Sequence, residues 1–277
     1  MNSNKGNSGI SAAIHDSMAS FCQNQQLLEN TKSKEYSIKV ANTLDERAAV
    51  FRAGYQIYLN KGFIKPNPQN WMIKTFDFDE DTLILIVQDK HKNLAGSVTL
   101  VFDGCSRLPA EKIYGNEIKK LRNSGERLVE LSRLVISPEY RNSKEILILL
   151  FNYLSIYSLH SKNYTSLVIE VNPRHKEYYK KLLGFEEIGE EKSCPIVQNA
   201  PAVLLHLPLQ KYQSEIKRCH ELSHENKRER TLYSFFLKPE QENLVAFYLQ
   251  KQAAPMSLEE KQYFGFSDTN LKMTAVV

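Results

Sequence analysis

The sequence lacks any segment able to cross a membrane as a helix. None of its apolar runs approaches the roughly 20 residues that span a bilayer, and the N-terminus does not show the basic-then-apolar pattern of a secretory signal. The expected compartment is therefore the cytoplasm.

Cysteine is also scarce. The chain has 4 cysteines in 277 residues, widely separated and without a CxxC pair: Cys22, Cys105, Cys194 and Cys219. A chain of this length does not depend on disulfide staples for its stability. We expect four reduced thiols.

A strong excess of one charge is missing as well. The net charge is +4, and the basic residues are spread along the chain instead of forming the stripe that grips nucleic acid. Nucleic-acid binding is therefore disfavoured. The sequence also has no GxSxG elbow, Walker loop or GxGxxG fingerprint, so the hydrolase, NTPase and dinucleotide-binding classes have no support.

One short motif suggests a zinc site instead. Residues 220–224 read His-Glu-Leu-Ser-His, which matches the HExxH zinc signature. Its flanks are almost entirely polar, whereas a catalytic metal helix has an apolar back. The extended form also fails, because Lys227 and Arg230 stand where glycine and a third histidine belong. We expect no metal site.

What the sequence does contain is the composition of a globular protein. Hydrophobic residues make up 42% and charged residues 25% of the chain. Residues 1–34 are polar and are expected to form a flexible lead segment. Residues 35–208 are expected to form one α/β domain, and residues 209–277 a helical C-terminal appendage.

The order of elements in the central region predicts a mixed α/β sheet with at least one right-handed crossover. The pattern predicts helices at 44–61, 109–123, 144–160 and 173–183. It predicts strands at 36–41, 83–88, 94–102, 127–137, 165–171, 185–190 and 202–207. The loop of about twenty residues after Gly62 is longer than most connections, so we expect it to have a function.

The strand expected at 127–137 carries charges within an apolar run. Regular alternation places Glu130 and Arg133 on opposite faces, unless a bulge intervenes. Since unpaired buried charge is strongly penalised, either these ions pair with each other or a functional site lies beside the strand. Both interpretations remain open from the sequence.

Three stretches carry a resemblance to a known family. They are residues 51–58 (Phe-Arg-Ala-Gly-Tyr-Gln-Ile-Tyr), 127–134 (Arg-Leu-Val-Glu-Leu-Ser-Arg-Leu) and 172–175 (Asn-Pro-Arg-His) running on to Gly184-Phe185. In order and spacing the chain resembles the long-chain N-acyl amino acid synthases typified by FeeM. These are relatives of the acyl-homoserine lactone autoinducer synthases within the GNAT superfamily.

The resemblance implies a GNAT-like fold with a splayed central sheet and transfer of a long acyl chain to the amine of an amino acid or similar small molecule. It implies no permanently bound cofactor. The donor it implies is an acyl-phosphopantetheine thioester on acyl carrier protein. Coenzyme A is the weaker expectation, because Lys144 and Ile146 stand where the usual phosphate loop has glycines.

The same resemblance suggests residues for each task. Glu130 is the candidate base, Tyr179 the candidate acid for the departing thiolate, and His175 a possible proton shuttle. Free amides near Leu134, Val135 and Ile136 would face the thioester oxygen. The remaining candidates are arginines for the substrate (Arg52, Arg127, Arg133) and a basic landing site for the carrier protein (Arg141, Lys144, Arg174, Lys176, Lys180, Lys181).

Each assignment has a plainer alternative, such as a surface role for Arg52 and solvated helix residues for the basic set. At the level of function, the alternatives are a coenzyme A-dependent N-acyltransferase and a non-catalytic acyl-binding protein.

Overall fold

The computed structural model describes residues 35–104, 107–222 and 231–266. The expected lead segment, residues 1–34, lies outside the described residues, as do Cys22, Cys105 and His224. Within the described part of the chain, no helix combines the length and apolar character that a membrane span requires.

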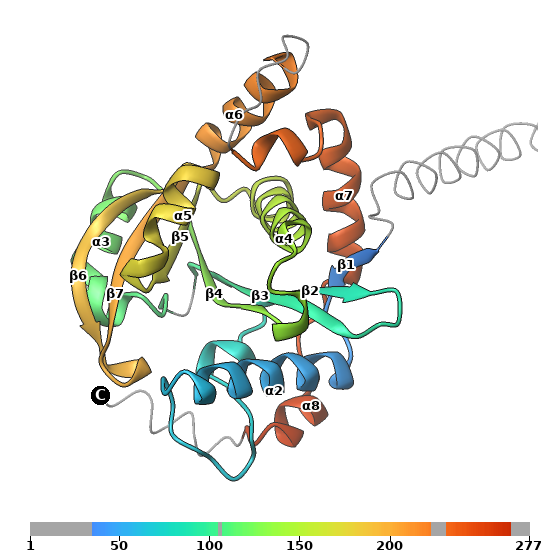
Figure 1. The fold of residues 1–277 in the computed structure, drawn as a ribbon, viewed down its shortest axis with the longest axis vertical. Helices are drawn as coiled ribbons and strands as arrows, with labels where there is room; N and C mark the ends of the chain where they lie inside the picture. The colour runs from blue at the N-terminus through green and yellow to red at the C-terminus, as the bar shows by residue number, and fades with distance from the viewer. Residues whose placement is uncertain (1–34, 105–106, 223–230, 267–277) are drawn as a thin grey trace, which may run out of the picture.

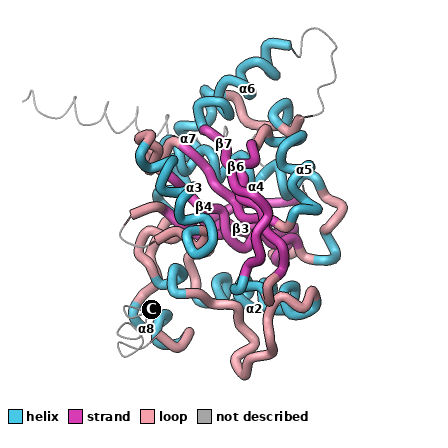
Figure 2. Tube along the Cα trace, turned by 90° about the vertical axis from the view of Figure 1, so that its left-hand side faces the viewer, coloured by secondary structure: helices cyan, strands magenta, loops and turns pink. Residues whose placement is uncertain are grey.

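A seven-stranded mixed sheet forms the centre of the molecule, in the order β1-β2-β3-β4-β5-β7-β6. All neighbours are antiparallel except β4 and β5. The strands are β1 (Tyr36–Val40), β2 (Leu83–Asp89), β3 (Leu94–Phe102), β4 (Leu128–Ile136), β5 (Ser166–Val171), β6 (Glu186–Cys194) and β7 (Ala200–Pro208). Figure 2 shows the twisted strands passing through the middle of the molecule with helices on either side.

Helices cover both faces of this sheet. On one face lie α4 (Lys144–Ile156, continued by a π-helical turn, Tyr157–Ser161), α5 (Pro173–Leu183), α6 (Leu209–Leu222) and α7 (Pro239–Gln252). On the other face lie α2 (Leu44–Asn60), α3 (Glu111–Asn123) and α8 (Leu258–Tyr263). Figure 1 shows α4 and α7 on the side of the sheet opposite to α2 and α8.

Local sequence signals set several of these boundaries. The Thr43 hydroxyl caps α2 by accepting from the Glu46 amide, and α5 ends at Gly184, whose φ of 71° suits glycine. Two extents were mispredicted. Strand β6 continues to Cys194 because it pairs with β7 along its whole length, and the helical region after residue 232 is divided by extended segments into separate short helices.

The central strands part, as the fold expectation requires. β4 and β5 pair only at Leu128, Val129 and Glu130, and no pairing continues beyond Glu130. The helix α5 follows the free end of β5 directly. The sheet is therefore open on one side of β4 from this point onward.

A β-bulge interrupts β4 just after the strands part. Ser132 pairs with Thr99 and Val135 with Ser97, so Arg133 and Leu134 together face Val98. Arg133 has a φ of 46°, which few non-glycine residues adopt. The bulge shifts the alternation by one residue. It brings the Arg133 guanidinium to Thr99, on the face of the sheet that Glu130 and Ser132 share.

Candidate active site

A cavity of about 1430 Å³ lies where β4 and β5 separate. Its walls come from α2, the loop before β2, the start of α3, both parted strands, α5 and the C-terminal segment. The long loop after Gly62 contributes Met72, Ile73, Lys74, Thr75, Phe76, Phe78 and Asp79. This size exceeds that of an ordinary small-molecule pocket, so the cavity has room for a long chain together with a second substrate.

Glu130 lies in this cavity at the point where the strands part. It is 3% exposed, and one carboxyl oxygen accepts a 2.8 Å hydrogen bond from the backbone amide of Ala110, just before α3. Burial raises the pKa of Glu130 to about 8, helped by the negative charges of Glu170 and Glu111. A carboxyl group with such a pKa can accept a proton near neutral pH.

A second carboxyl group, Glu170 on β5, also lines the cavity. Burial raises the pKa of Glu170 above its usual value, although a hydrogen bond with the Cys194 thiol opposes this effect. Sequence reasoning missed Glu170, although the signal was present. It is an acidic residue within the near-continuous apolar strand at 165–171, the same kind of feature that singled out Glu130.

Arg133 is buried and pairs with Asp77, not with Glu130. Its two terminal nitrogens contact the two Asp77 carboxylate oxygens. They also donate to the Met72 carbonyl and the Thr99 hydroxyl, each at 2.8 Å. The guanidinium fork is therefore occupied by the protein itself. Arg133 orders the long loop against β4. It also lines the cavity, where its Nε is the one donor of the guanidinium group without a partner.

The β4 backbone behaves differently on the two sides of the bulge. Leu134 lines the cavity, and neither it nor Arg133 has a paired residue in β3. Val135 and Ile136 pair with Ser97 and Gly96 and do not line the cavity. Of the three predicted oxyanion amides, only the one at Leu134 therefore belongs to a residue that lines the cavity.

The helix α5 places hydroxyl and imidazole groups on the cavity. Tyr179 packs against Phe151 and Phe185, with ring centroids 6.0 and 6.1 Å apart, and burial raises its pKa. A tyrosine held protonated in this way can donate a proton to a departing thiolate. His175 also lines the cavity, where its Nε2 accepts from Arg174 Nε at 3.1 Å, and partial burial lowers its pKa.

Comparison with known proteins identifies the family. The family model of N-acyl amino acid synthase FeeM matches residues 49–208 of the chain, more than half of its length. The chain belongs to this family. It is therefore an acyltransferase, an N-acyl amino acid synthase that takes its acyl group from a thioester and gives it to an amino acid.

The solved structure of FeeM shows the same fold. FeeM itself, from uncultured soil microbes, is 26% identical and superposes with a TM-score of 0.56, over 65% of this chain and 93% of that one. The acyl-homoserine lactone synthase LasI is 16% identical (TM-score 0.48; 63% and 89% covered). An acyl-CoA N-acyltransferase from Pseudomonas aeruginosa is 17% identical (TM-score 0.44; 62% and 97% covered). No curated protein matches the chain. The GNAT-like α/β fold and the family resemblance are confirmed.

Two of the arginines suggested for substrate binding lie away from the cavity of this synthase. Arg52 is exposed on α2, with its guanidinium carbon 5.9 Å from the centre of the Trp71 ring. Arg127 precedes β4, lies over the Tyr164 ring at 4.8 Å and donates to the Asn163 carbonyl at 3.0 Å. Neither lines the cavity. The structure does not bring them together with Glu130.

The basic residues suggested for a carrier protein divide into two groups. Lys176 pairs with Glu187 at 3.1 Å, and Lys180 and Lys181 each pair with Glu177 at 3.5 Å, so their charge is largely compensated. The others are exposed without a carboxylate partner in the described residues: Arg141, Lys144 and Arg174. Of all six, only Arg174 lines the cavity.

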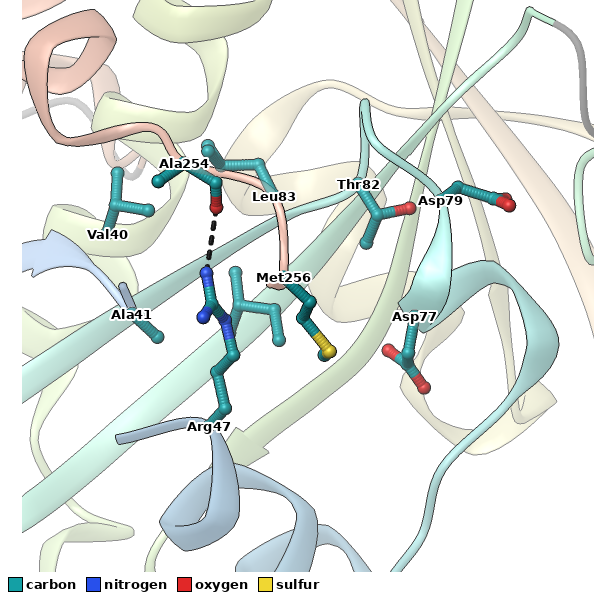
Figure 3. Close-up of a pocket in the computed structure, with 10 residues that line it drawn as sticks. Val40, Ala41, Arg47, Asp77, Asp79, Thr82, Leu83, Ala254 and Met256 are labelled. Carbon is teal, nitrogen blue, oxygen red and sulfur yellow. Dashed lines mark hydrogen bonds between the residues drawn. The ribbon is translucent and has the colours of Figure 1, made fainter. Parts of the chain in front are cut away.

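The C-terminal arm, residues 254–266, reaches back to α2 and completes one wall of the cavity with Lys261, Gly265 and Phe266. Arg47 holds this arm by donating to Glu260 at 2.5 Å and to the Ala254 carbonyl at 2.8 Å. Figure 3 shows Arg47 and Ala254 beside a separate cavity of about 10 Å³, which is too small for a substrate.

The described residues of the competing zinc motif are not arranged as metal ligands. His220 Nε2 lies 3.0 Å from the carbonyl oxygen of Phe236, and His224 lies outside the described residues. Over the ranges that the structure describes, no three His, Cys, Asp or Glu side chains are grouped to hold a metal ion.

Proposed function

We propose that this synthase transfers a long acyl chain from acyl carrier protein to the amino group of an amino acid. The observation that carries the proposal is the buried carboxyl group of Glu130, with its raised pKa, at the point where a large cavity opens between β4 and β5. A thioester placed in the gap between the strands has its reacting carbon next to this group.

The reaction follows from the groups around the cavity. The amine nitrogen attacks the thioester carbon, and Glu130 accepts the proton that the nitrogen loses. The developing oxyanion is stabilised by the backbone amide at Leu134, on the open side of β4. When the carbon–sulfur bond breaks, Tyr179 protonates the thiolate. Its buried position, which keeps the phenol protonated, supports this role.

Two features favour acyl carrier protein over coenzyme A as the donor. Residues 141–146 contain no glycine, and the side chain of Ile146 is fully buried against Gly96, so the backbone there cannot approach a pyrophosphate closely. Arg174 and Lys61 both line the cavity. Burial lowers the pKa of Lys61, and the nearby positive charge of Arg174 lowers it further. Such a pair suits the single phosphate of a carrier-bound phosphopantetheine arm.

The carrier protein is acidic in this family, so the exposed cations Arg141, Lys144 and Arg174 are the part of the basic set best placed to meet it. Lys176, Lys180 and Lys181 would add to this surface only by leaving their glutamate partners. Carrier-bound acyl chains are cytoplasmic, and the proposal places the reaction in that compartment.

The test uses purified protein with palmitoyl-acyl carrier protein or palmitoyl coenzyme A and a mixture of the twenty amino acids. We expect mass spectrometry to find an N-palmitoyl amino acid chiefly with the carrier protein. Higher kcat/KM with coenzyme A would assign the donor to coenzyme A instead. If neither donor gave an amide, the protein would be a non-catalytic acyl-binding member of the fold.

A further inference from the structure

The acceptor of an N-acyl amino acid synthase brings a carboxylate, and the two terminal nitrogens of Arg133 are already bound within the protein, which leaves only its Nε without a partner. The guanidinium fork of Arg133 is taken by Asp77, Thr99 and the Met72 carbonyl. A carboxylate that enters the cavity loses much of its hydration and needs a cation in return. A cation with this role rests on the proposed function and belongs to the same cavity.

Several other cations line the cavity, namely Lys61, Lys74, Arg107, Lys112, Arg174 and Lys261. Lys74 and Lys112, like the other four, form no ion pair with any residue that the structure describes, and these two lie close enough for the charge of Lys112 to act on Lys74. Lys74 is half-buried and Lys112 is exposed at the rim. Two unpaired ammonium groups on the wall of a cavity form a site that favours an anion.

The position of Lys74 is fixed by the Arg133–Asp77 ion pair. The backbone amide of Lys74 donates to Asp77 Oδ2 at 2.7 Å, and the same oxygen accepts from Arg133 Nη1 at 2.7 Å. Burial lowers the pKa of Lys74, and the positive charges of Arg133 and Lys112 lower it further. Three cations therefore converge, while Asp77 is already shared with Arg133.

The position of Lys112 relates this anion site to the reaction. Lys112 lies in the first turn of α3, two residues after Ala110, whose amide holds the Glu130 carboxyl group. In an α-amino acid the amine and the carboxylate are attached to the same carbon atom. A carboxylate bound in the first turn of α3 would therefore keep the amine within reach of Glu130.

We propose that Lys74 and Lys112 bind the carboxylate of the amino acid acceptor and so present its amine to Glu130. The Lys61–Arg174 pair, beside His175 and near Tyr179, is left for the donor. This division assigns one basic group of the cavity to each substrate. It also predicts that the synthase discriminates against amines that lack a carboxylate.

The experiment compares amino acids with the amines that lack only the carboxylate. Phenylalanine, leucine and tyrosine are each assayed against 2-phenylethylamine, isoamylamine and tyramine, with palmitoyl-acyl carrier protein as the donor. The variants are Lys74→Gln, Lys112→Gln and the double variant. Lys61→Gln is the matched control, since it removes a different ammonium group from the same cavity.

We expect each single lysine variant to raise KM for the amino acids about 10- to 100-fold, as for the loss of one charged hydrogen bond. The values of kcat/KM for the amines should change little, so the preference for the amino acid falls. Lys61→Gln should keep that preference. An unchanged preference in the double variant would overturn the proposal, and so would a rise in KM for the donor alone.

The same assay separates this inference from the proposed function. If the wild-type protein acylates none of the six acceptors and none of the twenty amino acids, the proposed function fails. If it acylates amino acids and amines equally well before any substitution, transfer to amines stands, while carboxylate recognition by Lys74 and Lys112 is wrong.

Discussion

Arg133 and Asp77 form an ion pair in which the two side chains are 3% and 0% exposed. The pair joins β4 to the long loop across 56 residues of sequence. It lies beside the bulge that turns Arg133 toward Thr99, and the rings of Phe51 and Phe76 lie 5.2 and 5.4 Å from the guanidinium carbon. This buried ion pair thus helps to hold one wall of the cavity.

Removing one partner of this pair should be costly. Arg133→Met leaves a buried carboxylate without its cation, and we expect a loss of about 3–5 kcal/mol in the free energy of unfolding. The double variant Arg133→Met/Asp77→Leu should recover a large part of that loss. Urea denaturation of the wild type, the single variant and the double variant measures the change in the free energy of unfolding. Arg52→Met is the control at an exposed arginine.

If Arg133 instead contacted the acceptor, Arg133→Lys would raise KM for the amino acid while leaving the urea midpoint unchanged. That result would contradict the structural role assigned to Arg133 here.

The activity should follow the ionisation of Glu130. A base must be deprotonated to act, so kcat/KM should rise with pH until it levels off above about 8, the pKa of Glu130. Glu130→Gln should lower kcat about 10²- to 10⁴-fold. A variant that keeps wild-type turnover would exclude Glu130 as the base.

The same group should make stability depend on pH. Because the folded-state pKa is raised from 4.5 to about 8, the folded protein keeps a proton that the unfolded chain has lost between these values. The free energy of unfolding should therefore fall as pH rises through this window, by up to about 1.4 kcal/mol per pH unit from this group.

Above pH 8 the contribution of Glu130 should be constant. Glu130→Gln should flatten the slope between pH 5 and 8 in urea titrations. If this variant does not fold at all, the carboxyl group is needed chiefly for structure, through its bond with the Ala110 amide.

Glu170 should tune the base across the gap between the strands. Its negative charge contributes to the raised pKa of Glu130, so Glu170→Gln should shift the rising limb of the pH–rate profile to lower pH. The matched control is Glu187→Gln, an acidic residue on β6 outside the cavity. If the rising part of the pH–rate profile stayed at the same pH in Glu170→Gln, the carboxyl groups of Glu130 and Glu170 would not interact.

Gly189 should be essential for the packing of α3. A Cβ atom at this position would meet the Tyr114 ring at 2.6 Å. The Tyr114 hydroxyl anchors α3 because it lies within hydrogen-bonding distance of two carbonyl oxygens, those of Glu190 at 2.9 Å and Ala202 at 2.7 Å, and donates its one proton between them. We expect Gly189→Ala to cost about 1–3 kcal/mol and to lower turnover, because Ala110, whose amide holds Glu130, immediately precedes α3.

The control for this prediction is Gly115→Ala on the same helix. Nothing lies within 4 Å of a Cβ atom there, so this change should stabilise the protein by up to about 1 kcal/mol. Thermal denaturation should separate the two variants. Equal effects would contradict the close packing at Gly189.

The C-terminal arm can be followed by fluorescence. Trp71 is the only tryptophan in the chain, and its ring centre lies 5.4 Å from that of Tyr263 and 5.0 Å from that of Phe264. Glu260→Ala breaks the bond with Arg47, so we expect the arm to loosen and the emission to shift to longer wavelength.

Glu259→Ala, an exposed neighbour in the first turn of α8, should leave the spectrum unchanged. If the arm were held without the bond between Arg47 and Glu260, the emission wavelength of Glu260→Ala would equal that of the wild type.

The sequence by itself determined much of this protein. The Thr43 cap, the apolar periodicity of α2 and the charges within the strand at 127–137 are local features, and local features predict local structure. They indicated the elements, the long loop that lines the cavity, and Glu130 as a charge within an apolar strand. The three motif stretches then indicated the family.

Only the tertiary structure decided which groups meet. Alternation predicts the face of a side chain only while a strand stays regular, and the bulge at Arg133 shifts that alternation by one residue. Arg133 could have paired with Glu130, yet Asp77 is its partner because the loop folds over β4. The gap beside Glu130 and Glu170 likewise arises from strand pairing, which depends on contacts between residues far apart in the sequence.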